Sequence, residues 1–238
     1  MTTSNSTVFN VTRDQIINGA LRILGVLSTG QTADVGQITE AAEALNIFVK
    51  ALEAEGMPQW GISTYAIPLT AAANTYQIGI GKTINISKPL KVIQAWNHDS
   101  TSNIDIPMRL LTRQEYSMLG NKTSSGNPIQ YYYEPRINYG VLSVFPTPSS
   151  TEATNNTIYI TYQRTFEDFL AAGDTPDFPQ EWLETLKYGL AVRLASEYGI
   201  DAESRRLLTQ EYMIIKNAAL SFGSEEGSLF FGIDRRWY

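Results

Sequence analysis

The sequence predicts an α+β protein in which helical segments at both ends of the chain enclose a β-rich middle. Three observations lead to this prediction. Residues 12–60 and 176–222 repeat apolar side chains every three or four positions, the spacing of helices that bury one face. Residues 61–165 instead alternate short runs rich in Ile, Val, Tyr and Thr with turn residues, as strands do. The 238 residues, of which 43% are apolar, suffice for one large domain or two small ones.

The first helical hairpin is marked by a capping box at the start of each helix. Thr12 is followed by Gln15, and Asp34 by Gln37, so each pair can bond the unpaired amides of a first helical turn. Residues 56–58, Gly-Met-Pro, end the second helix. The expected buried stripes comprise Ile16, Ala20, Ile23, Leu24, Leu27, Ile38, Ala41, Leu45, Phe48, Val49 and Leu52.

The middle of the chain predicts a small antiparallel sandwich or barrel. A short helix over residues 112–119 interrupts it, with Thr112 as its cap and Glu115 completing a capping box. The expected strands cover residues 63–69, 75–78, 90–96, 129–134, 141–145 and 157–162.

Residues 177–198 form the helix around which the chain is organised. Pro179, Glu181 and Glu184 suit its first turn, where amides lack acceptors and the helix dipole is positive. Asp201 then caps a last helix, which is expected to bury Leu208, Tyr212, Ile215, Ala219 and Phe222. The residues expected in the core and against neighbouring helices are Trp182, Leu183, Leu186, Gly189, Leu190 and Leu194.

Each helical hairpin alone leaves an apolar face bare, so we expect the two to pack as a four-helix bundle with the antiparallel β domain inserted between them. The predicted parts are an N-terminal arm with the first hairpin (1–60), the β insertion (61–165), the second hairpin (166–223) and an extended C-terminal arm (224–238). That arm is rich in the residue types that dominate binding hot spots, which favours a partner over folding onto its own helices. Its binding residues are expected to be Phe230, Phe231, Ile233, Arg235, Arg236, Trp237 and Tyr238.

The amino-acid composition excludes several kinds of chemical site. The chain has no cysteine and a single histidine, His98, so disulfides, thiolate metal sites and multi-histidine metal sites within one chain are excluded, and no cofactor is expected. The polar N-terminus and the lack of an apolar run of about 18 residues predict synthesis in the cytoplasm and no membrane partner. A net charge of −6 argues against wrapping of DNA, although not against a protein that DNA merely passes.

Two motifs resemble catalytic or nucleotide-binding patterns. Residues 79–83, Gly-Ile-Gly-Lys-Thr, lack the first glycine and the following helix of a phosphate-binding loop, which indicates a turn. His98 stands beside Asp99, as a general base would, but no nucleophile motif accompanies the pair, which favours a solvated loop.

Acidic pairs leave a hydrolase open as an alternative, because glycoside hydrolysis needs two carboxylates across one bond. The pairs are Glu167 with Asp168 and Glu225 with Glu226, and solvated surface is the simpler interpretation. A second alternative is a carbohydrate-binding module that uses residues 131–133, three consecutive tyrosines. A strand sends alternate residues to opposite faces, so at least one of these rings looks outward, either for a ligand or for cross-strand aromatic pairing.

The helical segments resemble a known family. Residues 177–195 are similar to the Pro-Glu-x-aromatic…Gly-x-Ala-x-x-Leu-Ala helix of head-to-tail adaptor (connector) proteins of tailed bacteriophages, and residues 17–25 to their Ile-x-x-Ala-Leu-x-x-(Leu/Ile)-Gly helix. With a large β insertion, the chain looks most like the adaptor of short-tailed phages, the tail tubular protein A or tail accessory factor family.

This resemblance implies a non-enzymatic structural protein of the virion neck, assembled in the host cytoplasm. It implies a dodecameric ring, formed by the helices, that joins the portal protein to the tail nozzle protein during genome packaging and ejection. The C-terminal arm would engage the portal. Double-stranded DNA would slide past an acidic channel wall without sequence-specific binding. The alternatives remain a virion-associated cell-wall or polysaccharide hydrolase and a carbohydrate-binding tail module.

Overall fold

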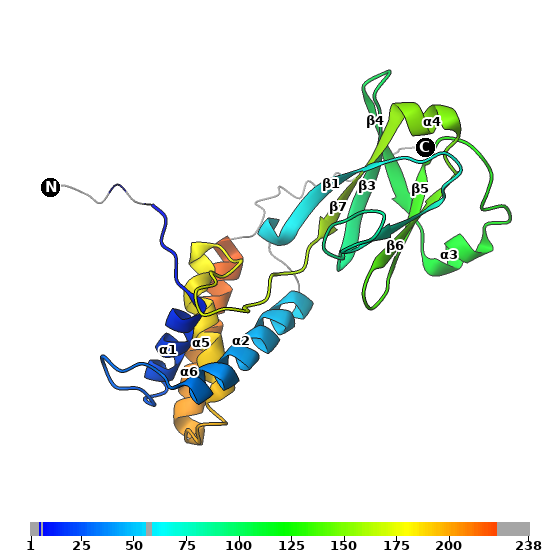
Figure 1. Cartoon of the computed structure of the whole chain (residues 1–238). Helices are drawn as coiled ribbons and strands as arrows, with labels where there is room; N and C mark the ends of the chain where they lie inside the picture. The colour runs from blue at the N-terminus through cyan, green and yellow to red at the C-terminus, as the bar shows by residue number, and fades with distance from the viewer. Residues whose placement is uncertain (1–4, 6, 56–58, 223–238) are drawn as a thin grey trace, which may run out of the picture. The chain divides into compact units, whose positions relative to one another are not determined.

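The computed structural model describes residues 5, 7–55 and 59–222, which form two compact units (Figure 1). The helical unit combines residues up to Ala51 with those from Asp168 onward, and the β unit runs from Leu52 to Glu167. The predicted C-terminal arm, 224–238, lies outside the described residues.

The helical unit is built from α1 (Arg13–Ile23), α2 (Val35–Glu55, whose last residues belong to the β unit), α5 (Leu183–Leu194) and α6 (Ala202–Phe222). A 3-10 turn, Gln180–Trp182, precedes α5. The α-helix therefore starts at Leu183, later than the start at Pro179 that the sequence predicts. It also ends at Leu194, before the predicted end at residue 198. The predicted stop of α2 at residues 56–58 lies outside the described residues.

Side chains cap three of these helices at their first turns. In α1 the Gln15 amide donates to Thr12 Oγ1 at 3.4 Å, and the Thr12 amide donates to Gln15 Oε1 at 2.9 Å. The Asp34 carboxylate accepts from the Gln37 amide at 2.9 Å, and Asp201 accepts from the first amides of α6. Each cap satisfies donors that the helix itself cannot satisfy.

The predicted four-helix bundle is wrong. Helix α5 packs closely against α1 and α6, whereas α2 has no comparably close backbone packing with another helix in the described part of the chain. Instead, the ring of Phe48 on α2 reaches α5 at Gly189, where an added Cβ would lie 2.1 Å from its Cζ. The connection between α1 and α2 contains Gly25 and Gly30, both at positive φ.

The β unit is larger than a small insertion. Its strands are β1 (Ile62–Pro68), β2 (Thr75–Ile78), β3 (Lys91–Asp99), β4 (Ile104–Leu110), β5 (Gln130–Pro135), β6 (Gly140–Phe145) and β7 (Asn156–Gln163). They form one seven-stranded sheet in the order β1-β7-β3-β4-β5-β6-β2, which curls in Figure 1. The short helices α3 (Arg113–Met118) and α4 (Ser150–Asn155) belong to this unit. Of the predicted fold, only the α+β class fits.

The sheet is not wholly antiparallel. Arg109 and Leu110 at the end of β4 pair in parallel with Gln130 and Tyr131 of β5. The predicted helix at 112–119 is confirmed as α3 with its Thr112–Glu115 capping box, and this helix lies in the crossover that a parallel pair requires. Strand β4 had not been predicted, because Pro107 and alternating charged residues hide its pattern.

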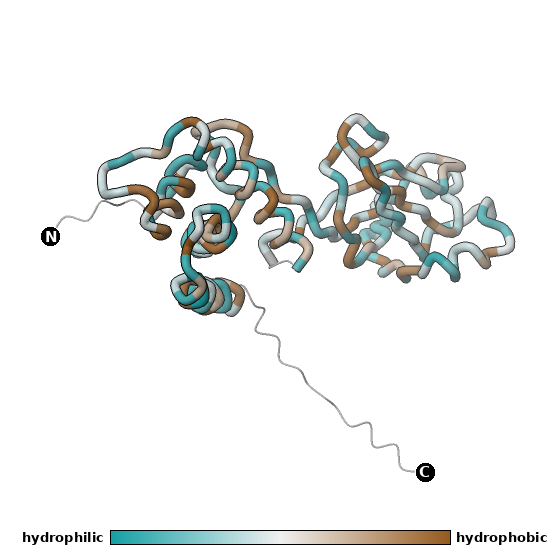
Figure 2. Tube along the Cα trace, turned by 90° about the horizontal axis from the view of Figure 1, so that it is seen from below, coloured by the Kyte–Doolittle hydropathy of each residue, from teal (hydrophilic) through white to brown (hydrophobic). Residues whose placement is uncertain are grey.

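Alternation along the strands builds the core of the β unit. Residues of β7 alternate between buried and half-buried over the whole strand, and Figure 2 shows hydrophobic residues interleaved with hydrophilic ones along the trace. The buried cluster draws residues from all seven strands and includes three tyrosines, Tyr76, Tyr131 and Tyr162, of which Tyr131 is the contribution of β5. Burial raises the pKa of each of these phenols, and that of Tyr133.

We expect alkaline pH to destabilise the β unit. A raised folded pKa means that the folded state holds its proton more tightly, so this contribution to stability is complete below the unfolded tyrosine pKa of about 10 and is lost as pH rises from there through the higher folded pKa values. Phenolate absorbance against pH, in water and in urea, should show four tyrosines that ionise only as the protein unfolds. Titration of all tyrosines together while the protein remains folded would contradict this expectation.

Candidate assembly surfaces

The pairing of strands β3 and β4 determines which carboxylate lies next to the His98 ring. His98 Nδ1 lies 2.7 Å from Oδ1 of Asp105, on the facing strand β4. The carboxylate that pairs with His98 is therefore that of Asp105 and not that of its chain neighbour Asp99. Asp99, one residue on, points to the other face and accepts from the Thr101 amide and the Ser102 hydroxyl in the hairpin turn. Residues 79–83 likewise form a turn, with the Lys82 amide donating to the Gly79 carbonyl at 3.1 Å.

The candidate hydrolytic acids do not converge in the described part of the chain. Asp168 forms an ion pair of 2.8 Å with Lys50, and Glu225 and Glu226 lie outside the described residues. Among the residues with described positions there is no group of three or more His, Asp or Glu side chains suited to a metal ion. No helix in those same residues is both long and apolar enough to cross a membrane.

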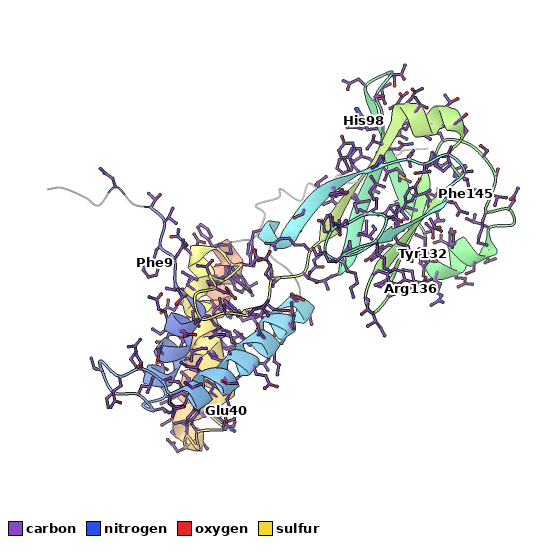
Figure 3. The ribbon with its side chains drawn as sticks, in the orientation of Figure 1. Phe9, Glu40, His98, Tyr132, Arg136 and Phe145 are labelled. Carbon is purple, nitrogen blue, oxygen red and sulfur yellow. The ribbon has the colours of Figure 1, made fainter. Side chains whose placement is uncertain are left out.

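The tyrosine run serves the fold. Tyr131 is buried in the core, and the Tyr133 hydroxyl donates to the Pro89 carbonyl at 2.6 Å. Tyr132 points to the opposite face and stacks on Tyr116 of α3, with ring centroids 5.3 Å apart (Figure 3). Tyr132 is therefore the outward ring, engaged in aromatic pairing within the chain.

The residues predicted for the second helical hairpin are mostly interior. Trp182, Leu186, Gly189, Leu190 and Leu194 are buried. Leu183 is only half-buried and lines a groove between α1, α5 and residues 9–11. A role in packing between copies stays a prediction for all six.

Helix α6 exposes apolar side chains on both sides of its buried stripe. Leu208, Tyr212 and Ala219 face the interior. Leu207 and Ile214, seven residues or two turns apart, lie to one side, and Ile214 is 70% exposed. To the other side lie Met213 and Leu220, again two turns apart and both exposed. Phe222, expected in the core, is 76% exposed. We define these two pairs, 207/214 and 213/220, as the α6 flanks.

The α6 flanks were missed because periodicity indicates only which face is most apolar. The sequence signal was present, since the helix carries more apolar residues than one stripe can hold. Exposed aliphatic residues at regular spacing on one helix are costly in water unless another surface covers them.

A second exposed apolar site lies at the tip of the β5–β6 hairpin, where Arg136 is labelled in Figure 3. Ile137 is 92% exposed there, and Ile80 on the adjacent 79–82 turn is 77% exposed. The Lys88 ammonium donates to the carbonyls of Arg136 and Ile137 at 3.1 and 3.3 Å, which fixes the tip from another segment of the chain. We call residues 79–82, Lys88 and 136–139 the hairpin tip.

Tyr139 completes the hairpin tip. Its hydroxyl accepts from the Arg136 guanidinium at 3.0 Å, and Lys82 Nζ lies 4.8 Å from its ring centroid. It packs so closely on Gly79 that a Cβ there would lie 3.0 Å from the Tyr139 Cβ. The tip is thus a preorganised apolar knob carrying three cations, of which Arg136 also pairs with Glu134 at 2.9 Å.

A third surface lies on α2, where Glu40 is labelled in Figure 3. Glu40, Glu43 and Ile47 share the face opposite the buried stripe, and Ile47 is 54% exposed. Among the described residues neither Glu40 nor Glu43 has an ion-pair partner. Burial, then the charges of Glu40 and Asp34, raises the pKa of the Tyr198 hydroxyl, in keeping with a negative potential on this side of the unit. We call residues 40, 43 and 47 the acidic α2 face.

Exposed apolar surfaces of this kind are typical of proteins that bind other proteins. The profile of the SU10 adaptor protein family matches residues 11–224, and because this match covers most of the chain, the protein belongs to that family. Membership identifies a structural adaptor protein of the bacteriophage virion, in agreement with the adaptor resemblance of the helical segments. A search of curated proteins found no match.

Proposed function

We propose that this protein is a head-to-tail adaptor whose copies form a ring, a dodecamer, between the portal protein and the tail nozzle protein. The observation that carries the proposal is the pair of exposed α6 flanks. A ring closes through heterologous contacts, in which each subunit presents one surface to the preceding copy and a different surface to the next. Two apolar sides on a single helix fit this requirement, and α6 leads directly into the C-terminal arm.

The C-terminal arm is proposed to anchor the ring on the portal. In the sequence, the arm begins two residues after Phe222, the last residue of α6. Its aromatic and arginine side chains, residues 230, 231, 233 and 235–238, are of the types that supply most of the binding energy in protein interfaces. A net charge of −6 on each copy suits a channel through which DNA slides during packaging and ejection, because like charges do not hold it.

The α6 flanks are tested by the variant L207S/I214S. Both side chains are exposed, so the fold is expected to persist while the contact between copies is lost. Mass spectrometry of the intact assembly with portal rings gives the copy number, since each chain adds 26.5 kDa. The unmodified chain should give one defined assembly and the variant none. L170S, at an 84% exposed position elsewhere in the helical unit, is the matched control and should assemble normally. Normal assembly of L207S/I214S would contradict the ring contact.

Removal of residues 224–238 separates the anchor from the ring. The truncated chain should fail to join the portal while the described fold remains. If the full chain never joins the portal, the adaptor proposal falls, and if the truncated chain joins it equally well, the arm is not the anchor.

A further inference from the structure

The hairpin tip is unusual for this protein because it gathers positive charge in a chain of net charge −6. Lys82, Lys88 and Arg136 surround the exposed Ile137, and their contacts with Tyr139 and with the tip carbonyls hold it in one conformation. A knob that is already ordered loses little conformational entropy when it binds. The surface that covers it should combine an exposed apolar side chain with nearby negative charge.

Three exposed apolar surfaces of the helical unit differ in the charges around them. The groove beside Leu183 is lined by Arg22 and Lys187 as well as Glu184. The α6 flanks follow Arg205 and Arg206 near the start of that helix. Arg206 pairs with Glu203 at 2.7 Å, whereas Arg205 donates only to the Ser196 hydroxyl, at 2.8 Å. Cations at both places disfavour a positively charged knob.

The acidic α2 face has the complementary pattern. Ile47 lies at the C-terminal end of this face, with Glu43 one turn and Glu40 two turns before it on the same side of the helix. Lys50, one turn after Ile47, is neutralised by its 2.8 Å ion pair with Asp168. Since neither carboxylate has an ion-pair partner among the described residues, both are available to the cations of the hairpin tip. Opposite charges around a small apolar contact fix the register of two surfaces and exclude wrong partners.

We propose that the hairpin tip of one copy binds the acidic α2 face of a neighbouring copy, with Ile137 against Ile47. This contact rests on the proposed ring and deepens it, because it joins two different surfaces of the same chain, as a closed ring requires. In this contact the β unit of one subunit binds the helical unit of the next. The α6 flanks make a separate contact in the same ring.

The lack of native cysteine makes a direct test possible, since introduced thiols are the only ones present. I47C and I137C are prepared as separate full-length chains and mixed, assembled with portal rings and oxidised gently. A disulfide forms only when the two Cα atoms come within about 7 Å of one another. We expect a crosslinked dimer from the mixture, none from either variant alone, and a ladder of higher multimers from the double variant I47C/I137C.

I104C is the matched control. Ile104 is 54% exposed and starts β4 beside a different hairpin of the same unit, so a mixture of I104C with I47C should give no crosslink. In E40K/E43K/I47C the charge complementarity is reversed, and the crosslink to I137C should be lost.

Intact mass separates the outcomes. Copies that assemble without a 47–137 crosslink would overturn this contact and leave the ring standing. Copies that never associate would overturn the contact and the ring together. A crosslink from I104C as strong as that from I137C would show nonspecific encounter and would also overturn the contact.

Discussion

Replacement of Gly189 by alanine is expected to destabilise the helical unit by about 2–4 kcal/mol. An alanine Cβ would lie 2.1 Å from Cζ and 2.6 Å from Cε1 of Phe48, so the ring would have to leave its site. Phe48 is 4% exposed, lies edge-on to Tyr212 with centroids 6.0 Å apart, and has the Arg193 guanidinium 5.4 Å above it. Displacing the ring therefore loosens α2 from α5 and α6 together.

The direction of the stability change in G189A is informative, because helix propensity alone would change the stability in the opposite direction. Alanine inside a helix is favoured over glycine by about 1 kcal/mol, so a purely local effect would stabilise α5. Urea unfolding of the full chain, with hydrogen exchange to locate the change, measures the outcome.

G19A is the matched control for G189A. Its Cβ also meets a neighbour, at 2.7 Å, but that neighbour is the flexible end of Lys187, which can move away at little cost. G19A should therefore be close to neutral. F48L should relieve part of the cost of G189A, and equal effects of the two glycine substitutions would contradict the role of the Phe48 ring.

Replacement of Gly140 by alanine is expected to destabilise the β unit by about 2–4 kcal/mol. The added Cβ would lie 2.1 Å from the Tyr133 hydroxyl and 2.4 Å from its Cε2, so the phenol would be driven from its position over the β6 backbone. Tyr133 would then lose its 2.6 Å hydrogen bond to the Pro89 carbonyl, which ties β5 to the segment before β3.

A double-mutant cycle isolates this contact. In a Y133A background the space is empty, so G140A should cost much less than in the unmodified chain. G120A is the control within the same unit, because no atom lies within 4 Å of its added Cβ. Unfolding transitions followed by near-ultraviolet circular dichroism report on the tyrosine environment. A G140A cost unchanged by Y133A would contradict the mechanism.

The candidate surfaces depend on side chains whose exposure was not predictable from spacing. Ile137 lies in a short turn that the sequence marks as a tip, but its rigidity comes from Lys88, which is 49 residues away in sequence. Ile47 and Ile214 lie in helices whose buried stripes were predicted. They lie outside those stripes, on helix faces where the sequence does not indicate which other surface, if any, covers them. Membership of the adaptor family was indicated by helix motifs alone, because these are short-range patterns.

The sequence by itself determined the features that form within a few residues. The capping boxes of Thr12 and Thr112, the Asp201 cap, the turn at residues 79–83 and the change from helical to alternating spacing all depend on hydrogen bonds and periodicities that close over two to five residues. These contacts have little choice of partner, so the local residues specify them.

Tertiary structure alone decided how these elements meet. It paired His98 with Asp105 instead of Asp99 and paired the end of β4 in parallel with β5. It also placed the Phe48 ring of α2 against Gly189 of α5 in a helical unit that is not the predicted four-helix bundle. Each of these outcomes joins residues far apart in the chain or on opposite faces of a strand, where many partners are chemically acceptable. The choice among them depends on the packing of the whole unit, because close-packed interiors accept few arrangements of the same side chains.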